Sequence, residues 1–217
     1  MRLFITRGVH AAVTVASPKA AIVIDPGFFG YPASVDTAAA VLVTHDHFVH
    51  VDLAKLAESL KRNAALRVYA PTPLDLGGES RRVTLVKEGD AFTVGDLPVR
   101  VIGKEQATAS LDDGPIANVG YLIAESLLHP GDARPELQHI DTLFTALAAP
   151  WQNNPQLEGY LRAVEPRRVI GLHDATLSDL GRDFAQKTLE KIARSYGGEA
   201  IALNAGDSVT LDIPNPS

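Results

Sequence analysis

The stretch Val41-Leu42-Val43-Thr44-His45-Asp46-His47-Phe48-Val49-His50 carries three of the seven histidines in the chain. Its first three residues are wholly apolar, which is typical of a short strand buried on both faces. From Asp52 onward, leucine and alanine recur at helical spacing, and Asp52 itself is a suitable N-cap. The three histidines are therefore predicted to lie on a loop between a buried strand and a helix.

The spacing of these histidines favours a metal site. On an extended stretch, side chains two residues apart point the same way, so His45 and His47 can reach one ion together. The turn into the helix then brings His50 to a second position nearby. Imidazole is a good ligand for zinc and other borderline metals. The alternative interpretation is three exposed histidines on a polar loop, and their position after a buried strand argues against it.

Two later stretches also end in side chains that can bind a metal. Leu127-Leu128-His129-Pro130-Gly131-Asp132 ends in a Gly-Asp turn, which aims the carboxylate of Asp132 out of the strand end. Val169-Ile170-Gly171-Leu172-His173-Asp174 is a second buried strand that ends in histidine. Both follow strands, as the three histidines do, and loops at strand ends are where such ligands usually converge.

Composition narrows the class of protein. With 217 residues and no cysteine, we expect a single domain over 1–217 that has no disulfide and no thiolate metal ligand. The net charge of −6 and the scattered basic residues argue against a nucleic-acid partner. No run approaches the roughly 18 apolar residues of a membrane span. We therefore expect a cytoplasmic protein without a membrane partner.

The order of predicted elements indicates two packed sheets with helices outside. The first half is rich in short apolar runs, and strand–helix alternation follows it. Helices are expected from residue 52 onward and near 155–164 and 179–196. Strands are expected at 2–6, 11–16, 20–24, 41–43, 67–70, 83–86, 91–94, 98–103, 118–123, 126–129, 168–172, 200–203 and 208–211.

Residues 44–50 resemble the Thr-His-x-His-x-Asp-His signature of the metallo-β-lactamase superfamily. The resemblance covers nearly the whole chain in the family's order, and the early Gly8-Val9-His10-Ala11 is similar to the lactonase-like branch of small bacterial hydrolases. It implies an α+β fold, a four-layer αββα sandwich. Further matching stretches are 21–27, 118–123, 129–132 and 168–173.

The resemblance also implies a metal centre. In that family, two metal ions, often zinc and sometimes manganese, share an aspartate and a hydroxide that attacks the substrate. Carried over, His45 and His47 would bind the first ion, His50 and His173 the second, and Asp132 would bridge them as the catalytic carboxylate. The implied substrate is a small ester, lactone, phosphoester or amide.

Two positions depart from the family pattern. Val49 stands where the family has an aspartate, and Gln106 is the nearest counterpart of a family histidine. The reduced set favours one zinc ion over two, with manganese, iron or nickel as alternatives. Asp46, Glu105 or Asp174 could act as a replacement ligand. The function expected is a metal-dependent hydrolase, and the alternative is a catalytically inactive or sensing member with at most a structural metal.

Supporting roles near the site are expected for five residues: His10, Asp25, Asp46, Gln106 and Asp174. His10 is expected either to line the pocket or to sit satisfied within a strand. Asp25 is expected to hold a ligand histidine by a hydrogen bond rather than to bind metal itself. Packing roles are favoured for His129 and Trp151, and His139 is expected to be exposed.

Overall fold

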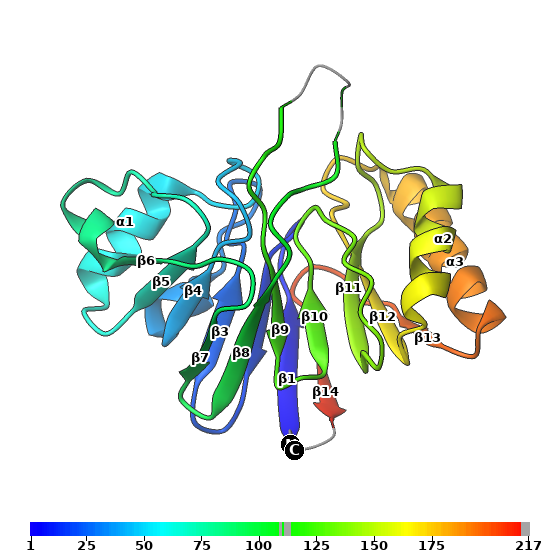
Figure 1. The fold of residues 1–217 in the computed structure, drawn as a ribbon, viewed down its shortest axis with the longest axis horizontal. Coiled ribbons are helices and arrows are strands. Elements are labelled where there is room, and N and C mark those ends of the chain that lie inside the picture. The colour runs from blue at the N-terminus through cyan, green and yellow to red at the C-terminus, as the bar shows by residue number, and fades with distance from the viewer. Residues whose placement is uncertain (109, 111–113, 214–217) are drawn as a thin grey trace.

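In the computed structural model, which describes residues 1–108, 110 and 114–213, two sheets pack face to face with helices on both outer sides (Figure 1). Among the described residues each sheet has seven strands. The order of the first sheet is β14 (Ser208–Asp212), β1 (Arg2–Arg7), β2 (Val13–Ala16), β3 (Ala21–Ile24), β4 (Ala40–Leu42), β5 (Arg67–Ala70) and β6 (Val83–Leu85). The order of the second is β13 (Glu199–Ile201), β12 (Arg168–Leu172), β11 (Thr142–Ala146), β10 (Leu127–His129), β9 (Gly120–Ile123), β8 (Leu97–Ile102) and β7 (Ala91–Val94).

Each sheet is antiparallel on one side and parallel on the other. In the first sheet, the pairs from β14 to β3 are antiparallel and those from β3 to β6 are parallel. The second sheet is antiparallel from β7 to β10 and parallel from β10 to β13. Loops that follow the parallel strands of a sheet leave it at the same edge. The loop after β4 in the first sheet carries His45, and the loop after β12 in the second sheet carries His173.

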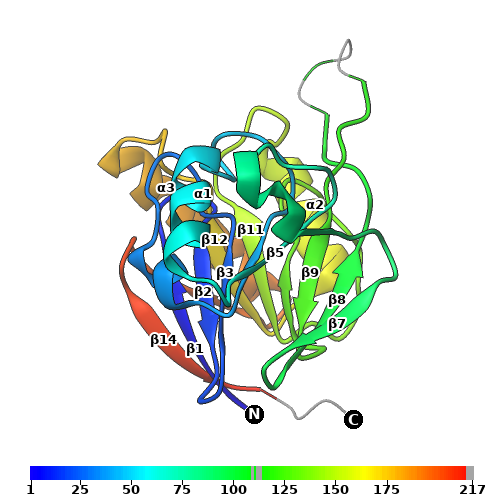
Figure 2. The ribbon, with the colours of Figure 1, turned by 90° about the vertical axis from the view of Figure 1, so that its left-hand side faces the viewer.

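The outer layers are built from three α-helices and two short 3-10 helices in the described residues. Helix α1 (Leu53–Arg62) covers the first sheet, and α2 (Asn154–Val164) and α3 (Asp179–Ser195) cover the second (Figure 1). Figure 2 looks onto the first sheet from the side of α1. The 3-10 helices are η1 (Ala33–Thr37) and η2 (Gly77–Arg82). No helix in the described part of the chain has the length and apolar character needed to cross a bilayer.

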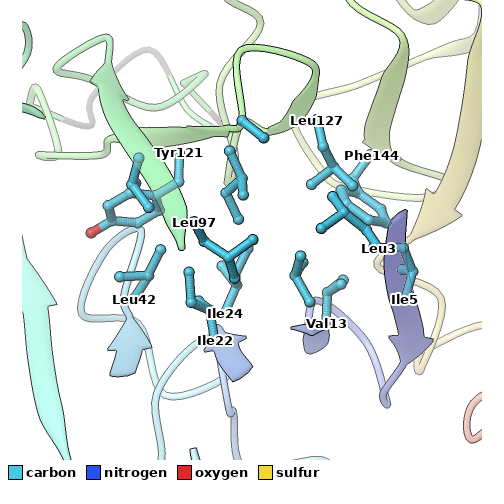
Figure 3. Close-up of a cluster of buried hydrophobic side chains, with 14 of the residues drawn as sticks. Leu3, Ile5, Val13, Ile22, Ile24, Leu42, Leu97, Tyr121, Leu127 and Phe144 are labelled. Carbon is cyan, nitrogen blue, oxygen red and sulfur yellow. The ribbon is translucent and has the colours of Figure 1, made fainter. Parts of the chain in front are cut away.

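Period-2 alternation in the buried strands divides the core into layers. On β3, Ile22 and Ile24 face the other sheet and pack in one cluster with Tyr121 and Phe144 (Figure 3). Val23 points the opposite way, into the cluster between the first sheet and α1. A strand that is buried on both faces in this way reads as a continuous apolar run.

The four-layer α+β architecture confirms the predicted fold class. The predicted helix start is also confirmed, because the side chain of Asp52 accepts a hydrogen bond from the backbone amide of Lys55 at 3.1 Å. One strand, β11 (Thr142–Ala146), was absent from the predicted elements. All five of its residues are buried, so it lacks the apolar–polar alternation that marks a half-exposed strand.

Candidate metal centre

The segment after β3 packs against the loop that carries His45, His47 and His50. The backbone amide of Phe28 donates to the carbonyl oxygen of Phe48 at 3.0 Å. Gly27 packs so closely that a Cβ atom there would lie 1.8 Å from the carbonyl oxygen of Val49. The loop can therefore approach the 25–28 segment only because residue 27 has no side chain.

Asp25 fixes one of the three histidines. Its carboxylate is fully buried and accepts hydrogen bonds from the Thr44 backbone amide (2.8 Å), the Thr44 hydroxyl (2.7 Å) and Nδ1 of His50 (2.8 Å). Burial would raise the pKa of Asp25, but the interaction with His50 outweighs it and holds the pKa below its ordinary value. Asp25 is therefore ionised, and Nε2 of His50 is turned away from it toward the site.

The same arrangement recurs at the other two buried ligand candidates. The Thr44 hydroxyl donates to Asp25, so its oxygen accepts from Nδ1 of His45, 3.1 Å away. Nδ1 of His173 donates to the carbonyl oxygen of Ala148 at 2.8 Å. With Nδ1 protonated and occupied, the neutral imidazole offers the lone pair of Nε2 to a cation. All three Nε2 atoms, those of His45, His50 and His173, approach Asp132.

Asp132 stands between these histidines and presents one oxygen to each side. Its Oδ1 lies 3.3 Å from Nε2 of His50 and 3.5 Å from Nε2 of His173. Its Oδ2 lies 3.8 Å from Nε2 of His45 and accepts a hydrogen bond from the indole nitrogen of Trp151 at 3.3 Å. The Asp132 backbone amide donates to Oδ1 of Asn118, which fixes the turn after β10.

His47 and His10 complete the histidine cluster. Nδ1 of His47 lies 3.1 Å from Nε2 of His45. The ring of His10, from the loop after β1, lies 3.8 Å from the ring of His173 between centroids. Among the residues that the structure describes, two groups of three have ligand atoms within 4.8 Å of one another: His45, His50 and Asp132, and His10, His50 and His173.

Several polar atoms of this cluster are buried without a hydrogen-bond partner among the described residues. They are both ring nitrogens of His10, Nε2 of His50 and of His173, and Oδ1 of Asp132. An unsatisfied buried polar atom costs about 1–3 kcal/mol, so a group of such atoms indicates that a partner other than the protein itself binds here. Imidazole nitrogens and a carboxylate are the donors that a borderline divalent metal takes, and the residues fit such an ion.

Electrostatics of the metal-free cluster agree with this interpretation. Burial lowers the pKa of His10 and of His45 to about 3, so both rings are neutral and can donate a lone pair. Burial also opposes a charge on His50, but Asp132 and Asp25 outweigh it and raise its pKa to about 10. Without a metal, one proton on His50 thus supplies the positive charge between the two carboxylates.

A cavity of about 580 Å³ adjoins the cluster. Its polar wall includes the side chains of His10, His47, Asp132 and His173. The apolar wall is formed by Phe29, Phe48, Val49, Ala148, Ala149, Pro150 and Trp151, and Gln106 and Thr176 complete the lining. Among the described residues that line this cavity there is no lysine or arginine.

The other sequence candidates lie at different distances from the cluster. Gln106 lines the cavity, and its side-chain oxygen is buried without a partner in the described structure. Asp174 forms an ion pair of 2.5 Å with Arg7 and does not line the cavity. Asp46 and Glu105 are exposed and are also outside the cavity lining. In this structure, none of these three carboxylates therefore takes the place of the family aspartate that is absent at position 49.

His129 and His139 lie outside the metal-ligand cluster. Nε2 of His129 hydrogen-bonds to the carbonyl oxygen of Ala11 at 2.9 Å, a structural contact, and His139 is exposed. Three aromatic residues line the cavity: Phe29 and Phe48, which the sequence does not single out, and Trp151, for which the sequence favours packing over the alternative role of a cleft wall. Phe48 immediately follows His47 in the quoted stretch, and that position is the one sequence signal that could have identified it.

Comparisons with known proteins identify a family and relatives for the chain. A family described as "Beta-lactamase superfamily domain" matches residues 5–173. Protein Rv0786c of Mycobacterium tuberculosis is 32% identical over 178 residues, which is 78% of this chain and 82% of that protein.

Two solved structures are similar in fold, at sequence identities that carry no more than the fold. Igni18, a metallo hydrolase from the archaeon Ignicoccus hospitalis, has a TM-score of 0.74 at 15% identity, over 99% of this chain and 100% of that one. The diiron β-hydroxylase CmlA from Streptomyces venezuelae has a TM-score of 0.70 at 19% identity; 98% of this chain matches 54% of that protein. The same fold thus serves both hydrolysis and oxidation in these two proteins.

Proposed function

Because the chain belongs to the β-lactamase superfamily, with the metallo-β-lactamase fold, we propose that it is a metal-dependent hydrolase of an uncharged ester, lactone or amide that bears an apolar group. One observation carries the proposal: the Nε2 atoms of His45, His50 and His173 and both oxygens of Asp132 converge beside a cavity with an apolar wall. Zinc is the ion we favour, because the candidate donors are imidazoles and one carboxylate.

The residues of the chain would divide the work of such a reaction. A bound metal supplies Lewis acidity and lowers the pKa of a water ligand toward neutrality. His45, His47, His50, His173 and Asp132 would hold the metal. Trp151 restrains Oδ2 of Asp132 by its indole N–H, which keeps the carboxylate oriented while Oδ1 faces His50 and His173.

The cavity lining supports an uncharged substrate over a phosphoester. Recognition of a phosphate group normally uses arginine or lysine. The described lining has neither, and Arg134 contacts this wall at the Trp151 ring, 5.5 Å from its centroid, without lining the cavity. Phe29, Phe48 and Trp151 instead offer aromatic surface, on which an acyl or aryl group would bury apolar area. Of the four substrate classes that the family resemblance implies, this wall favours the ester, lactone and amide.

The experiment compares substrates and metals on protein prepared without a chelating tag. After removal of metal, the protein is reloaded with zinc, manganese, iron(II) or nickel and assayed with p-nitrophenyl acetate, p-nitrophenyl octanoate, γ-nonalactone and p-nitrophenyl phosphate. We expect metal-dependent turnover that is faster for the octanoate than for the acetate, and no turnover of the phosphate. His45→Asn should abolish this activity, whereas His139→Asn, at an exposed histidine outside the site, should retain it.

Two results would overturn the proposal. Failure to hydrolyse any ester or lactone with any of the four metals would favour the non-catalytic alternative, in which the family fold carries at most a structural metal. Preferential turnover of the phosphate would leave a hydrolase but would refute the substrate class.

A further inference from the structure

The two groups of candidate ligands share one atom that cannot serve two ions. His50 belongs both to the group with His45 and Asp132 and to the group with His10 and His173, and Nε2 is the ring nitrogen that it has left for a metal. The other ring nitrogen of His50 is occupied by Asp25 at 2.8 Å. One lone pair binds one ion, so His50 must be assigned to a single metal.

The carboxylate of Asp132 decides the assignment. Oδ1 faces Nε2 of His50 and of His173, at 3.3 and 3.5 Å, whereas Oδ2 faces His45, whose Nε2 in turn lies 3.1 Å from Nδ1 of His47. His45 and His47 therefore lie on the Oδ2 side of the carboxylate, and His50 and His173 lie on the Oδ1 side. A bidentate bridge through Asp132 can serve one ion on each side.

The Oδ1 side holds His50, which directly follows Val49 in the chain, and Val49 stands where the family resemblance implies an aspartate. On this side, in the described part of the chain, the ligand atom of His10 lies within 4.8 Å of those of His50 and His173. His10 is 2% exposed, and neither of its ring nitrogens has a hydrogen-bond partner in the described residues.

We propose that His10 is a ligand of a second metal ion, which His50, His173 and Oδ1 of Asp132 complete, so that an imidazole takes the place of the absent carboxylate. This inference rests on the proposed metal-dependent function. It raises the expected content from one ion to two per chain, with His45, His47 and Oδ2 of Asp132 on the first.

The local backbone presents His10 in this position. The turn after β1 is closed by hydrogen bonds from the Gly8 amide to the Ala12 carbonyl (2.7 Å) and from the Ala12 amide to the Val9 carbonyl (3.1 Å). Within this turn His10 has φ of 61°, a left-handed conformation that non-glycine residues adopt rarely and mostly under tertiary constraint. His173 supplies the constraint through its amide, which donates to the His10 carbonyl at 2.9 Å.

The exchange of a carboxylate for an imidazole also changes which ion binds. Three neutral imidazoles and one shared carboxylate oxygen form a softer and less negatively charged set than the carboxylate-rich sites that suit manganese and magnesium. We therefore expect the second site to take zinc, cobalt(II), nickel or iron(II) and to discriminate against manganese.

The test measures metal stoichiometry, by plasma mass spectrometry of tag-free protein after dialysis against zinc or cobalt(II). Its matched pair is His10→Asn and His139→Asn: both histidines have positive φ (61° and 64°), and asparagine tolerates that conformation. We expect two ions per chain in the wild type and in His139→Asn, and one in His10→Asn. Because Val49 lines the same cavity as His10, we expect His10→Asn/Val49→Asp to recover the second ion.

Each outcome has a distinct meaning. Two ions in His10→Asn, or one ion in both the wild type and His10→Asn, would overturn the role of His10 and leave the proposed hydrolase intact. No ion in the wild type would instead refute the proposed function itself. Should His10→Asn fail to fold, zinc titration of wild-type protein labelled with ¹⁵N at histidine decides: the ring resonances of His10 must shift with the second equivalent, and unshifted resonances overturn the inference.

Discussion

The backbone amide of His173 donates a 2.9 Å hydrogen bond to the carbonyl oxygen of His10, and both residues have positive φ, 62° and 61°. The bond joins the loop after β12 in the second sheet to the loop after β1 in the first. Left-handed backbone at non-glycine residues is costly and concentrates where function demands it. The two sheets are therefore tied together at the candidate metal centre, and the ligand geometry depends on their packing.

Removal of the Asp25 carboxylate should weaken metal binding although Asp25 is not itself among the candidate ligands. In Asp25→Asn, Nδ1 of His50 loses its ionised acceptor, and the orientation of His50 Nε2 is no longer fixed. Loss of such an outer partner typically costs 10–100-fold in metal affinity. Competition against a chromogenic chelator measures the change. Asp36→Asn, which breaks an ion pair with Arg62 on the surface, is the control, and equal affinities in the two variants would contradict the role given to Asp25.

The single tryptophan should report metal binding directly. Trp151 is 7% exposed, and its indole nitrogen lies 3.3 Å from Oδ2 of Asp132, so an ion on that oxygen sits within a few ångströms of the ring. Cobalt(II) absorbs and is paramagnetic, and we expect it to quench the emission in proportion to site occupancy, with recovery on addition of a chelator. Unchanged fluorescence at saturating cobalt(II) would show that the ion binds elsewhere.

The parts of the site that sequence could predict are those encoded in short stretches. A buried apolar run that ends in Thr44-His45-Asp46-His47 encodes a strand end and its ligand candidates within a few residues. His173 directly follows β12 and Asp132 is the third residue after β10, so each could be selected without knowledge of the others. The fold class follows from the order of such strands and helices.

The parts that sequence could not predict depend on contacts between distant segments. Nothing near Trp151 in the chain indicates that its indole reaches Asp132, and the pairing of His10 with His173 spans the two sheets. The sequence favours one ion over two because the family ligand is absent at Val49. That His10 lies close to His50 and His173 cannot be inferred from the sequence. The position of His10 beside His173 depends on how the two sheets pack.

The metal-free protein should be most stable near pH 6.5. Burial lowers the pKa of His10 and His45 to about 3 in the folded protein, whereas their unfolded value is 6.5. Below pH 6.5 the unfolded chain therefore takes up protons that the folded chain does not, and the free energy of unfolding decreases as the pH decreases. The carboxylates of Asp132 and Asp25 outweigh burial and raise the pKa of His50 to about 10, so its contribution is complete below pH 6.5 and is lost between 6.5 and 10. Each unmatched proton changes the free energy of unfolding by about 1.4 kcal/mol per pH unit.

Thermal melts from pH 4 to 10 in the presence of a chelator measure this dependence. His50→Asn should remove the decline between pH 6.5 and 10 and leave the acidic decline in place. A melting temperature that is constant from pH 5 to 9 would contradict the burial of these rings in their stated charge states.

Removal of the aromatic wall should weaken substrate binding while leaving the fold intact. Phe48 lines the cavity and is 64% exposed in the free protein, so Phe48→Ser should raise KM for the octanoate ester about tenfold, the equivalent of roughly 1.4 kcal/mol of lost apolar contact, with little change in kcat. Phe184→Ser is the matched control, because Phe184 is 67% exposed on α3 and does not line the cavity. Equal KM values for the two variants would show that the substrate does not contact this wall.

Gly27 sets the closest approach of the histidine loop, and a single methyl group there should damage both stability and metal binding. In Gly27→Ala the new Cβ would lie 1.8 Å from the Val49 carbonyl oxygen and 3.0 Å from the His50 amide nitrogen; both are backbone atoms that move only with the loop. We expect a loss of about 1–3 kcal/mol in the free energy of unfolding, typical of overpacking, measured by urea denaturation of the metal-free protein. Because the displaced backbone carries His50, metal affinity should fall at least tenfold.

Gly159→Ala in α2 is the control. Its Cβ meets no atom within 4 Å, and alanine should raise the free energy of unfolding by about 0.5–1 kcal/mol there through helix propensity. Gly27→Ala with wild-type stability and metal affinity would mean that the 25–28 segment does not support the loop.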